Sequence, residues 1–225
     1  MRITDFEELI RQLPYEHQAF DVNHKNWKDV GQSEIINEIF RDQKSVSISR
    51  FELFHSTWDI KSFVIKLLMW GYPTKGRGNN IKNLLIPENF ELLISKLSNA
   101  IQKKYLTNDE VKELMNGVEG LGLSTLTKIL YFNRVIIEKY PALIFDQRVI
   151  NSINSDTKFL DNDIERFKKL NYTNAIDHYL YYLSYVDYLS RSMNVLPDQI
   201  EMFLFMFGTT LKEPEGDGRD WGDLD

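Results

Sequence analysis

A glycine-rich hairpin and a lone aspartate downstream of it are the residues whose types and spacing could do chemistry. The hairpin reads Gly117-Val-Glu-Gly120-Leu-Gly122 and lies between two helical patterns. Glycines let the backbone turn tightly and let phosphate oxygens approach its amide groups. The next helix, from about Ser124, presents its N-terminal dipole to an anion. The pattern predicts a grip on phosphate, although the glycines alone favour an ordinary helical corner.

Asp146 stands 24 residues after Gly122, at the end of the mostly apolar run 141–145. A helical pattern starts there, so its simplest role is to cap that helix, which is worth about 1 kcal/mol. A carboxylate that such a run shields from water also acts strongly on nearby charge. Cleavage of an N-glycosidic bond builds positive charge on the deoxyribose, and a fixed carboxylate stabilises that charge. One residue can serve both purposes.

These residues resemble the helix–hairpin–helix DNA glycosylase superfamily, whose hairpin element ends with a catalytic aspartate. The blocks WGYPTKGRGN and LSTLTKILYF…IFDQRV look like those of the bacterial 8-oxoguanine DNA glycosylase-like branch, and the resemblance covers roughly residues 55–150. It implies an enzyme that flips a damaged or modified base out of double-stranded DNA and excises it, leaving an abasic site. Asp146 then becomes the catalytic carboxylate. The implied phosphate grip consists of Gly117, Gly120, Gly122, Ser124 and Thr125.

The chain departs from the family pattern at the lysine that bifunctional members use to cleave the strand. That lysine follows the second hairpin glycine by two residues, where this chain has Ser124. Lys128 lies one helical turn further on, 18 residues before Asp146, a separation typical of the lysine–aspartate pair. If the hairpin sets the register, water is the nucleophile. If the spacing to Asp146 sets it, Lys128 is the nucleophile, whereas a lysine beside phosphate is the plainer reading.

A second irregular segment follows an apolar helix and is too rich in glycine to pack a core, so we expect it at the surface. Its cations and amides could bond phosphate or base edges, as a wedge or clamp, or it is a plain solvated loop. The residues assigned to DNA binding here are Lys75, Gly76, Arg77, Gly78 and Asn79.

A glycosylase also needs flat side chains to hold the extruded base. The candidates for this base pocket are Trp58, Asp59, Trp70 and Tyr72. Tyr181, Tyr185 and Tyr188 share a helical face, a spacing that favours packing in the core.

The composition excludes several classes of site. The absence of cysteine excludes disulfides, a thiol nucleophile, zinc–thiolate sites and a cysteine-ligated iron–sulfur cluster. Four scattered histidines make a metal site unexpected, and we expect no cofactor. The sequence has no run of about 18 apolar residues, so no membrane span is expected. The amphipathic, acidic N-terminus does not have the pattern of a secretory signal. We therefore expect a cytoplasmic monomer.

The net charge of −6 argues superficially against DNA binding, but the charge is unevenly distributed. Residues 61–150 hold 13 of the 27 basic and 8 of the 33 acidic residues, a local balance of +5. A local basic face is what phosphate binding needs, although a chance fluctuation would look the same.

The hydrophobic patterns predict an all-α fold, and the resemblance implies two closely packed helical subdomains with a cleft between them. The helix–hairpin–helix element spans about 107–150, within one unit over 1–211, and an acidic, flexible tail follows over 212–225. A strand-like alternation appears in Ser45–Phe54, but it is short. Helices are expected over Thr4–Leu13, from Ser33, over Trp58–Trp70, Pro87–Ile101, from Thr107, over Ser124–Lys139, from Asp146, over Thr173–Asn194 and from Pro197.

The resemblance suggests an 8-oxoguanine-like lesion as the substrate. Related compact bacterial glycosylases suggest a second class, hypermodified cytosines such as glucosylated ones in phage DNA, which would make the chain part of antiviral defence. Two further classes stay open: a non-catalytic helix–hairpin–helix module that only binds DNA, and a helical interaction protein whose glycines are mere caps.

Overall fold

The structure is a computed structural model that describes residues 2–55, 57, 59–76, 78–154, 167 and 169–211. Three of the sequence predictions lie outside the described residues: Trp58 in the base pocket, Arg77 in the glycine-rich loop and the acidic tail over 212–225.

Helices form most of the described chain. The α-helices are α1 (Glu7–Arg11), α2 (Ser33–Phe40), α3 (Arg50–His55), α4 (Ile60–Gly71), α5 (Asn80–Leu84), α6 (Pro87–Lys103), α7 (Asn108–Met115), α8 (Leu123–Phe132), α9 (Gln147–Ile153), α11 (Ala175–Met193) and α12 (Pro197–Phe207). Short 3₁₀ helices η1 (Ile3–Phe6), η2 (Tyr15–His17) and η3 (His24–Asn26) accompany them near the N-terminus.

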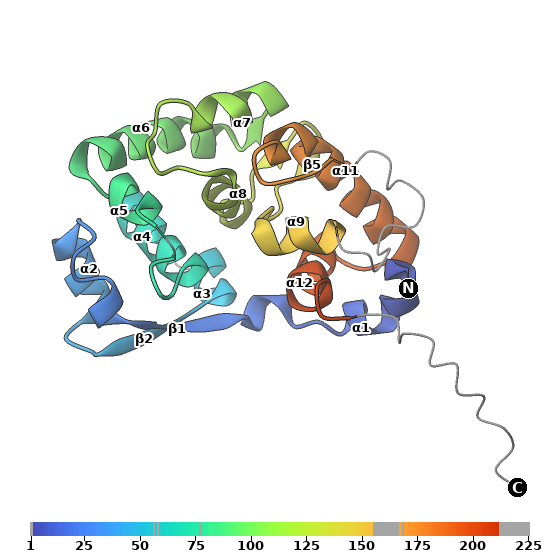
Figure 1. Ribbon diagram of the computed structural model, residues 1–225, viewed down its shortest axis with the longest axis horizontal. Helices are drawn as coiled ribbons and strands as arrows, with labels where there is room; N and C mark the ends of the chain where they lie inside the picture. The colour runs from blue at the N-terminus through green and yellow to red at the C-terminus, as the bar shows by residue number, and fades with distance from the viewer. Residues whose placement is uncertain are drawn as a thin grey trace, which may run out of the picture.

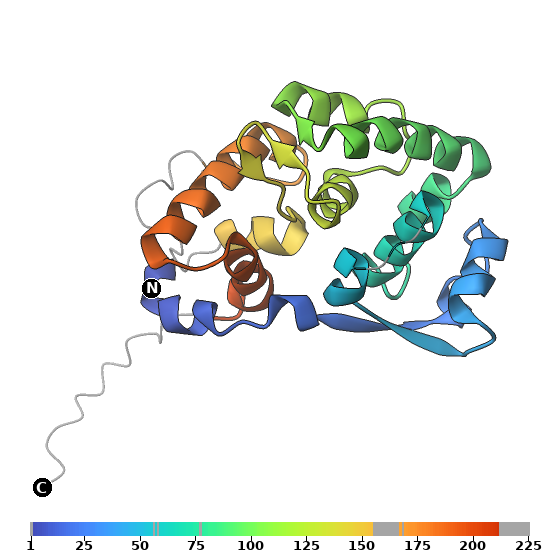
Figure 2. The same ribbon diagram turned by 180° about the vertical axis from the view of Figure 1, so that it is seen from behind.

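The helix α8 lies at the centre of the molecule, between two groups of elements (Figures 1 and 2). One group contains α2, α4 and α5, and the other contains α9, α11 and α12, while α6 and α7 lie across one side of both. The N-terminal α1 packs on α12, where Gln199 donates a hydrogen bond to the carbonyl oxygen of Arg11. The central helix is therefore in a position to present side chains to both groups.

The expectation of a helical fold is confirmed in its main part, since the described chain is mostly helical, but the fold is not strictly all-α because two small sheets accompany the helices. Strand β1 (Ala19–Asn23) pairs antiparallel with β2 (Ser45–Ser49), from Ala19 opposite Ser49 to Asn23 opposite Ser45. A second sheet has the order β3 (Tyr105–Leu106), β4 (Ile136–Ile137), β5 (Tyr140–Pro141). The strand-like alternation at Ser45 was thus a real strand that ends at Ser49, and its partner β1, also of five residues, was not predicted.

The helix–hairpin–helix element consists of α7, the turn over 116–122, and α8. The predicted helix from Thr107 is present as α7, and Thr107 and Glu110 form a capping box at its start. The prediction that the second helix runs to about Lys139 is wrong: α8 ends at Phe132 and Arg134 adopts a left-handed φ of 51°. The β-branched residues that follow pair with β3 instead, as such residues favour.

Candidate active site

Asp146 joins the buried run 142–145 to helix α9 and caps that helix, as the sequence predicted. Its Oδ1 accepts hydrogen bonds from the backbone N–H groups of Arg148 at 3.0 Å and Val149 at 3.2 Å. Capping thus occupies one carboxylate oxygen and leaves Oδ2 free for another partner. The side chain is only 12 % exposed, so its charge acts in a medium that screens it less than bulk water does.

The backbone before Asp146 is fixed by two tyrosines of α11. Tyr179 Oη donates to the carbonyl of Leu143 at 2.8 Å, and Tyr182 Oη donates to that of Ile144 at 3.2 Å. The ring of Phe145 stacks on Tyr182 with centroids 4.4 Å apart. Both tyrosines are fully buried, so these hydrogen bonds form out of reach of water and hold the carboxylate's backbone in place.

Lys128 of α8 is the partner of Asp146. Its Nζ lies 3.3 Å from Asp146 Oδ2 and 2.8 Å from Ser124 Oγ, and its side chain is 3 % exposed. Burial alone would lower the pKa of Lys128, but the charge and hydrogen bond of Asp146, together with Tyr72 and Glu201, oppose burial and leave the pKa above its ordinary value. The two alignments with the family pattern placed either Ser124 or Lys128 at the position of the family's lysine. Lys128 contacts the aspartate, and Ser124 is a hydrogen-bond partner of Lys128.

The glycine that ends α4 makes room for this lysine. A Cβ at Gly71 would lie 3.0 Å from Lys128 Cδ and 3.2 Å from its Cε. The adjacent Tyr72 lies over the same amine, with Nζ 5.3 Å from its ring centroid. Neither residue's role follows from helical periodicity, since both depend on α4 and α8 crossing at this point.

The hydroxyl groups at the start of α8 bond to protein groups rather than pointing to solvent. Tyr72 Oη lies 3.1 Å from Ser124 Oγ and 3.0 Å from Thr125 Oγ1, and both α8 side chains are buried. Tyr172, which the sequence gave no reason to select, places its hydroxyl against the backbone of Ser124, and burial raises the pKa of that hydroxyl. A Cβ at Gly122 would lie 2.8 Å from the same oxygen.

The exposed part of the hairpin is at Gly117, which adopts a φ of 77° and where an added Cβ would meet no described atom within 4 Å. Gly120 also has a positive φ, of 83°. Packing requires a glycine at this position, because an added Cβ would lie 2.3 Å from the carbonyl oxygen of Asn80 in α5. The hairpin therefore packs on α5, the helix that follows the glycine-rich loop.

The described part of that loop also departs from ordinary backbone conformation. Lys75, Gly76 and Gly78 all have positive φ values, of 68°, 69° and 75°. Gly76 and Gly78 are exposed, as is Asn79, whose side chain makes no capping hydrogen bond to α5. The loop thus presents an exposed backbone next to the hairpin.

A cavity of about 280 Å³ opens beside Lys128 and Asp146 and is called the Lys128 cavity below. Aromatic side chains from β1, α4 and α12 contribute to its lining, together with a buried carboxylate and arginine: Phe20, Trp70, Phe205, Glu201 and Arg50. Trp70, a candidate for the base pocket, thus lines the cavity, whereas Asp59 caps the opposite end of α4 through the N–H groups of Lys61 and Ser62. Neither Phe20 nor Phe205 was selected from the sequence.

Arg50 and Glu201 form an ion pair in the wall of the Lys128 cavity, and both side chains are essentially inaccessible to solvent. Arg50 Nη1 lies 2.7 Å from Glu201 Oε2 and 3.1 Å from Tyr131 Oη, and its Nε lies 2.7 Å from Gln18 Oε1. Burial raises the pKa of Glu201, and Arg50 opposes that rise. The pair joins α3 to α12, residues far apart in the sequence, so no local pattern reveals it.

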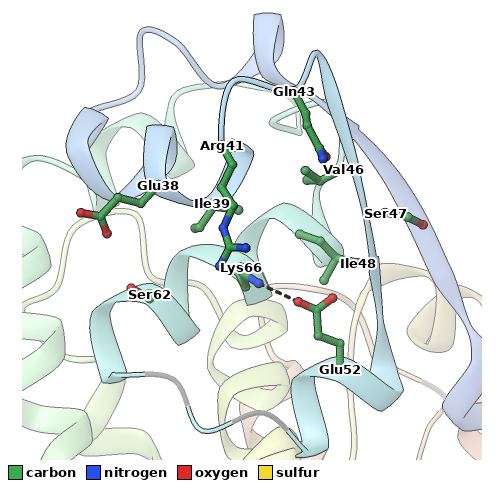
Figure 3. Close-up of a pocket in the computed structure, with 10 residues that line it drawn as sticks. All are labelled: Glu38, Ile39, Arg41, Gln43, Val46, Ser47, Ile48, Glu52, Ser62 and Lys66. Carbon is green, nitrogen blue, oxygen red and sulfur yellow. Dashed lines mark hydrogen bonds and ion pairs between the residues drawn. The ribbon is translucent and has the colours of Figure 1, made fainter.

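A larger cavity, of about 710 Å³, lies elsewhere, among α2, β2, α3 and α4 (Figure 3). There Lys66 Nζ lies 2.6 Å from Glu52 Oε1. Neither Lys128 nor Asp146 contributes to its lining. We call it the Lys66 cavity, and its ion pair is a useful reference for the one at Lys128.

The described residues contain neither a candidate metal-ion group nor a candidate membrane-spanning helix. No group of three or more His, Cys, Asp or Glu side chains is arranged to hold a metal ion among the described residues. None of the helices in the described ranges is long and apolar enough to cross a membrane.

Comparison with known proteins gives one match. The family model described as "Putative 8-oxoguanine DNA glycosylase OGG-like protein" matches residues 13–205. This range includes the hairpin, Lys128, Asp146 and Glu201. No curated protein and no solved structure matches the chain.

Proposed function

Because the chain belongs to this OGG-like DNA glycosylase family, we propose that it flips a damaged or modified base out of duplex DNA and cleaves its N-glycosidic bond at the Lys128 cavity. The observation that carries the proposal is the contact of Lys128 Nζ with Asp146 Oδ2, at 3.3 Å, in a cavity with aromatic walls. A flipped base needs such flat walls, and the reaction needs a nucleophile beside a fixed negative charge.

Lys128 is the nucleophile in this proposal, and Asp146 accepts its proton. The neutral amine attacks C1′ of the sugar while the bond from C1′ to the base breaks and its electron pair leaves with the base. The proton held on Asp146 passes to the departing base as the bond breaks, and the carboxylate that this leaves stabilises the positive charge on the sugar. The attacking nitrogen, which is positively charged after the attack, then passes a proton to the ring oxygen O4′. Opening of the sugar ring at O4′ gives a protonated imine, which allows elimination of the 3′ phosphate and hence lyase activity.

The order of protonation follows from the unbound site. The raised pKa of Lys128 means that the lysine rests as an ammonium ion paired with Asp146. An ammonium ion cannot attack, so the proton must move before the chemical step. The carboxylate oxygen at 3.3 Å is the acceptor in direct contact with it.

DNA backbone binding is assigned to the hairpin and the glycine-rich loop. Gly117 leaves room for a phosphate oxygen beside the hairpin amides, and the packing of Gly120 on Asn80 places the exposed loop residues Gly76 and Gly78 on the adjoining segment. The positive charge balance over 61–150 also supports the assignment of these two segments to one strand's phosphates. Duplex DNA with a damaged or modified base is the partner that this surface serves.

The family description suggests 8-oxoguanine or a similar lesion as the base. Glucosylated cytosine, with a role in antiviral defence, is the second candidate. A cavity of about 280 Å³ is just below the usual range for ligand sites, about 300–1,000 Å³. That size favours a bare base over one that carries a hexose.

Asp146→Asn tests the proposal against a module that only binds DNA. The amide oxygen can still cap α9, so the fold should persist, while the negative charge beside Lys128 is lost. We expect base release from duplexes carrying a panel of modified bases to fall by about 100-fold or more, with duplex binding retained. Thr107→Ala is the control, because it removes a helix cap outside the cavity. Equal base release by Asp146→Asn and the unaltered chain would contradict the mechanism.

A further inference from the structure

The Lys66 cavity is a second cavity, which the proposed chemistry does not use. Its volume of about 710 Å³ lies within the usual range for ligand sites, about 300–1,000 Å³. Its lining includes the apolar Val46 and Ile48 of β2 as well as the charged Arg41, Lys66 and Glu52 (Figure 3). Apolar side chains with a few polar groups among them are the usual lining of a site for a small organic molecule.

The positive charges of this lining exceed the negative charges beside them. Lys66 is only 7 % exposed and is paired with Glu52, at 2.6 Å between Nζ and Oε1, as a buried ammonium group requires. Arg41 is exposed, and its guanidinium group makes no hydrogen bond or ion pair with any side chain in the described part of the chain. In Figure 3 the side chain of Arg41 extends toward Lys66, whereas the carboxylate of Glu38 points away from both. Among the described residues, the second cation of the cavity is therefore left without a counter-ion.

The backbone at Arg41 is unfavourable for a residue that carries a side chain. Arg41 follows the last residue of α2 with a φ of 46° and a ψ of 50°, and the next residue, Asp42, has a φ of 64°. Glycine is favoured at this end of a helix because it adopts the left-handed conformation without strain. An arginine here costs stability, and strained residues of this kind concentrate at ligand sites. The strain therefore supports a binding role for the guanidinium group.

A ligand that brings the missing negative charge would match both kinds of side chain in the lining. The planar guanidinium group of an arginine binds two oxygens of a carboxylate or phosphate group at once. The apolar Val46 and Ile48 offer a contact for an uncharged part of the same molecule. A phosphate of the DNA backbone fits less well, because a cavity of about 710 Å³ has room for far more than one phosphate group.

We propose that the Lys66 cavity binds a small organic anion. Arg41 holds the carboxylate or phosphate group of this anion beside Lys66, and the apolar body of the anion lies against Val46 and Ile48. Neither Lys128 nor Asp146 lines this cavity, so the proposal does not depend on the glycosylase reaction.

The test is isothermal titration calorimetry with benzoate and phenyl phosphate as anionic probes and benzyl alcohol as the uncharged probe. The unaltered chain should bind at least one of the two anions and not the alcohol, and the tighter anion shows whether a carboxylate or a phosphate is favoured. In Arg41→Gly the binding of that anion should weaken at least about tenfold, because charge-assisted hydrogen bonds are strong. The midpoint of urea unfolding should stay equal or rise, because glycine relieves the left-handed backbone.

Arg134→Gly is the matched control. Arg134 also has a positive φ, of 51°, but does not contribute to the lining of the Lys66 cavity, so its replacement should leave anion binding unchanged. The proposal is overturned if neither anion binds saturably, if Arg41→Gly binds the anion as well as the unaltered chain does, or if both glycine variants lose binding equally. Weaker duplex binding by Arg41→Gly without any binding of the anions would also overturn it, since Arg41 would then belong to the DNA-binding surface.

Discussion

Gly71→Ala should separate activity from stability, because one methyl group would press on the nucleophile. The added Cβ would lie 3.0 Å from Lys128 Cδ and 3.2 Å from Cε, closer than ordinary van der Waals contact. The lysine stem must then move by a few tenths of an ångström, in a site where Nζ and Asp146 Oδ2 are 3.3 Å apart. Since a misplacement of about 1 Å can cost about 100-fold in rate, we expect a loss of roughly tenfold.

Stability should respond differently. Gly71 does not adopt a positive φ and ends a helix, so alanine reduces the freedom of the unfolded chain and favours folding by about 0.4–1 kcal/mol. The crowding of Lys128 offsets part of this gain. The free energy of unfolding should therefore stay within about 1 kcal/mol of its original value.

The assay is single-turnover base release from a duplex carrying 8-oxoguanine, measured beside urea unfolding of the same preparations. Slower release with unchanged unfolding supports the close contact of Gly71 with Lys128. Unchanged release would refute it, and so would a loss of activity that only follows a loss of stability.

Three further predictions follow from the same contacts. Tyr182→Phe removes one hydrogen bond to the backbone before Asp146, so the free energy of unfolding should fall by about 1 kcal/mol and base release several-fold; urea unfolding with no change would contradict it. Arg50→Met leaves Glu201 buried without its cation and should lower the free energy of unfolding by about 3–5 kcal/mol. The double variant Arg50→Met with Glu201→Leu should restore most of that loss. A double variant as unstable as Arg50→Met would refute the view that the unpaired carboxylate causes the loss. Because Lys128 has a raised pKa and must lose a proton to attack, borohydride trapping on abasic DNA should speed up about tenfold per pH unit below that pKa. Asp146→Asn removes the carboxylate that opposes burial and should move this profile to lower pH; a pH-independent rate would show that the amine is not the titrating group.

The local parts of the site could be predicted from the sequence because each depends on residues close in the chain. The capping box at Thr107 and the cap at Asp146 are short-range hydrogen-bond patterns. The spacing of 18 residues between Lys128 and Asp146 indicated a pair, and the two side chains do meet. The apolar run before Asp146 also indicated burial correctly.

The parts that were missed depend on contacts between distant segments. Arg50 and Glu201 lie on α3 and α12 and meet only when both pack beside α8. The two tyrosines that hold the backbone before Asp146 looked like ordinary core residues of α11, because their hydroxyl partners are backbone carbonyls that no side-chain pattern marks.

The two small sheets in a mostly helical fold were missed for a related reason. Strand β1 has only five residues and alternates polar with apolar side chains, a signal too short to outweigh the helical patterns around it. Its pairing with β2 becomes evident only in the folded chain. The second helix of the hairpin element was extended too far because the residues after Phe132 are apolar, and apolar residues suit a strand as well as a helix.

The most direct test of the central claim is borohydride trapping with a duplex that carries 8-oxoguanine, followed by peptide mapping of the adduct. The account predicts a covalent adduct on Lys128, its absence in Lys128→Gln, and its persistence in Lys66→Gln, which alters a second buried lysine that is paired with a glutamate in the other cavity. Abasic sites formed without any adduct, or an adduct that persists in Lys128→Gln, would contradict the claim that Lys128 attacks the sugar.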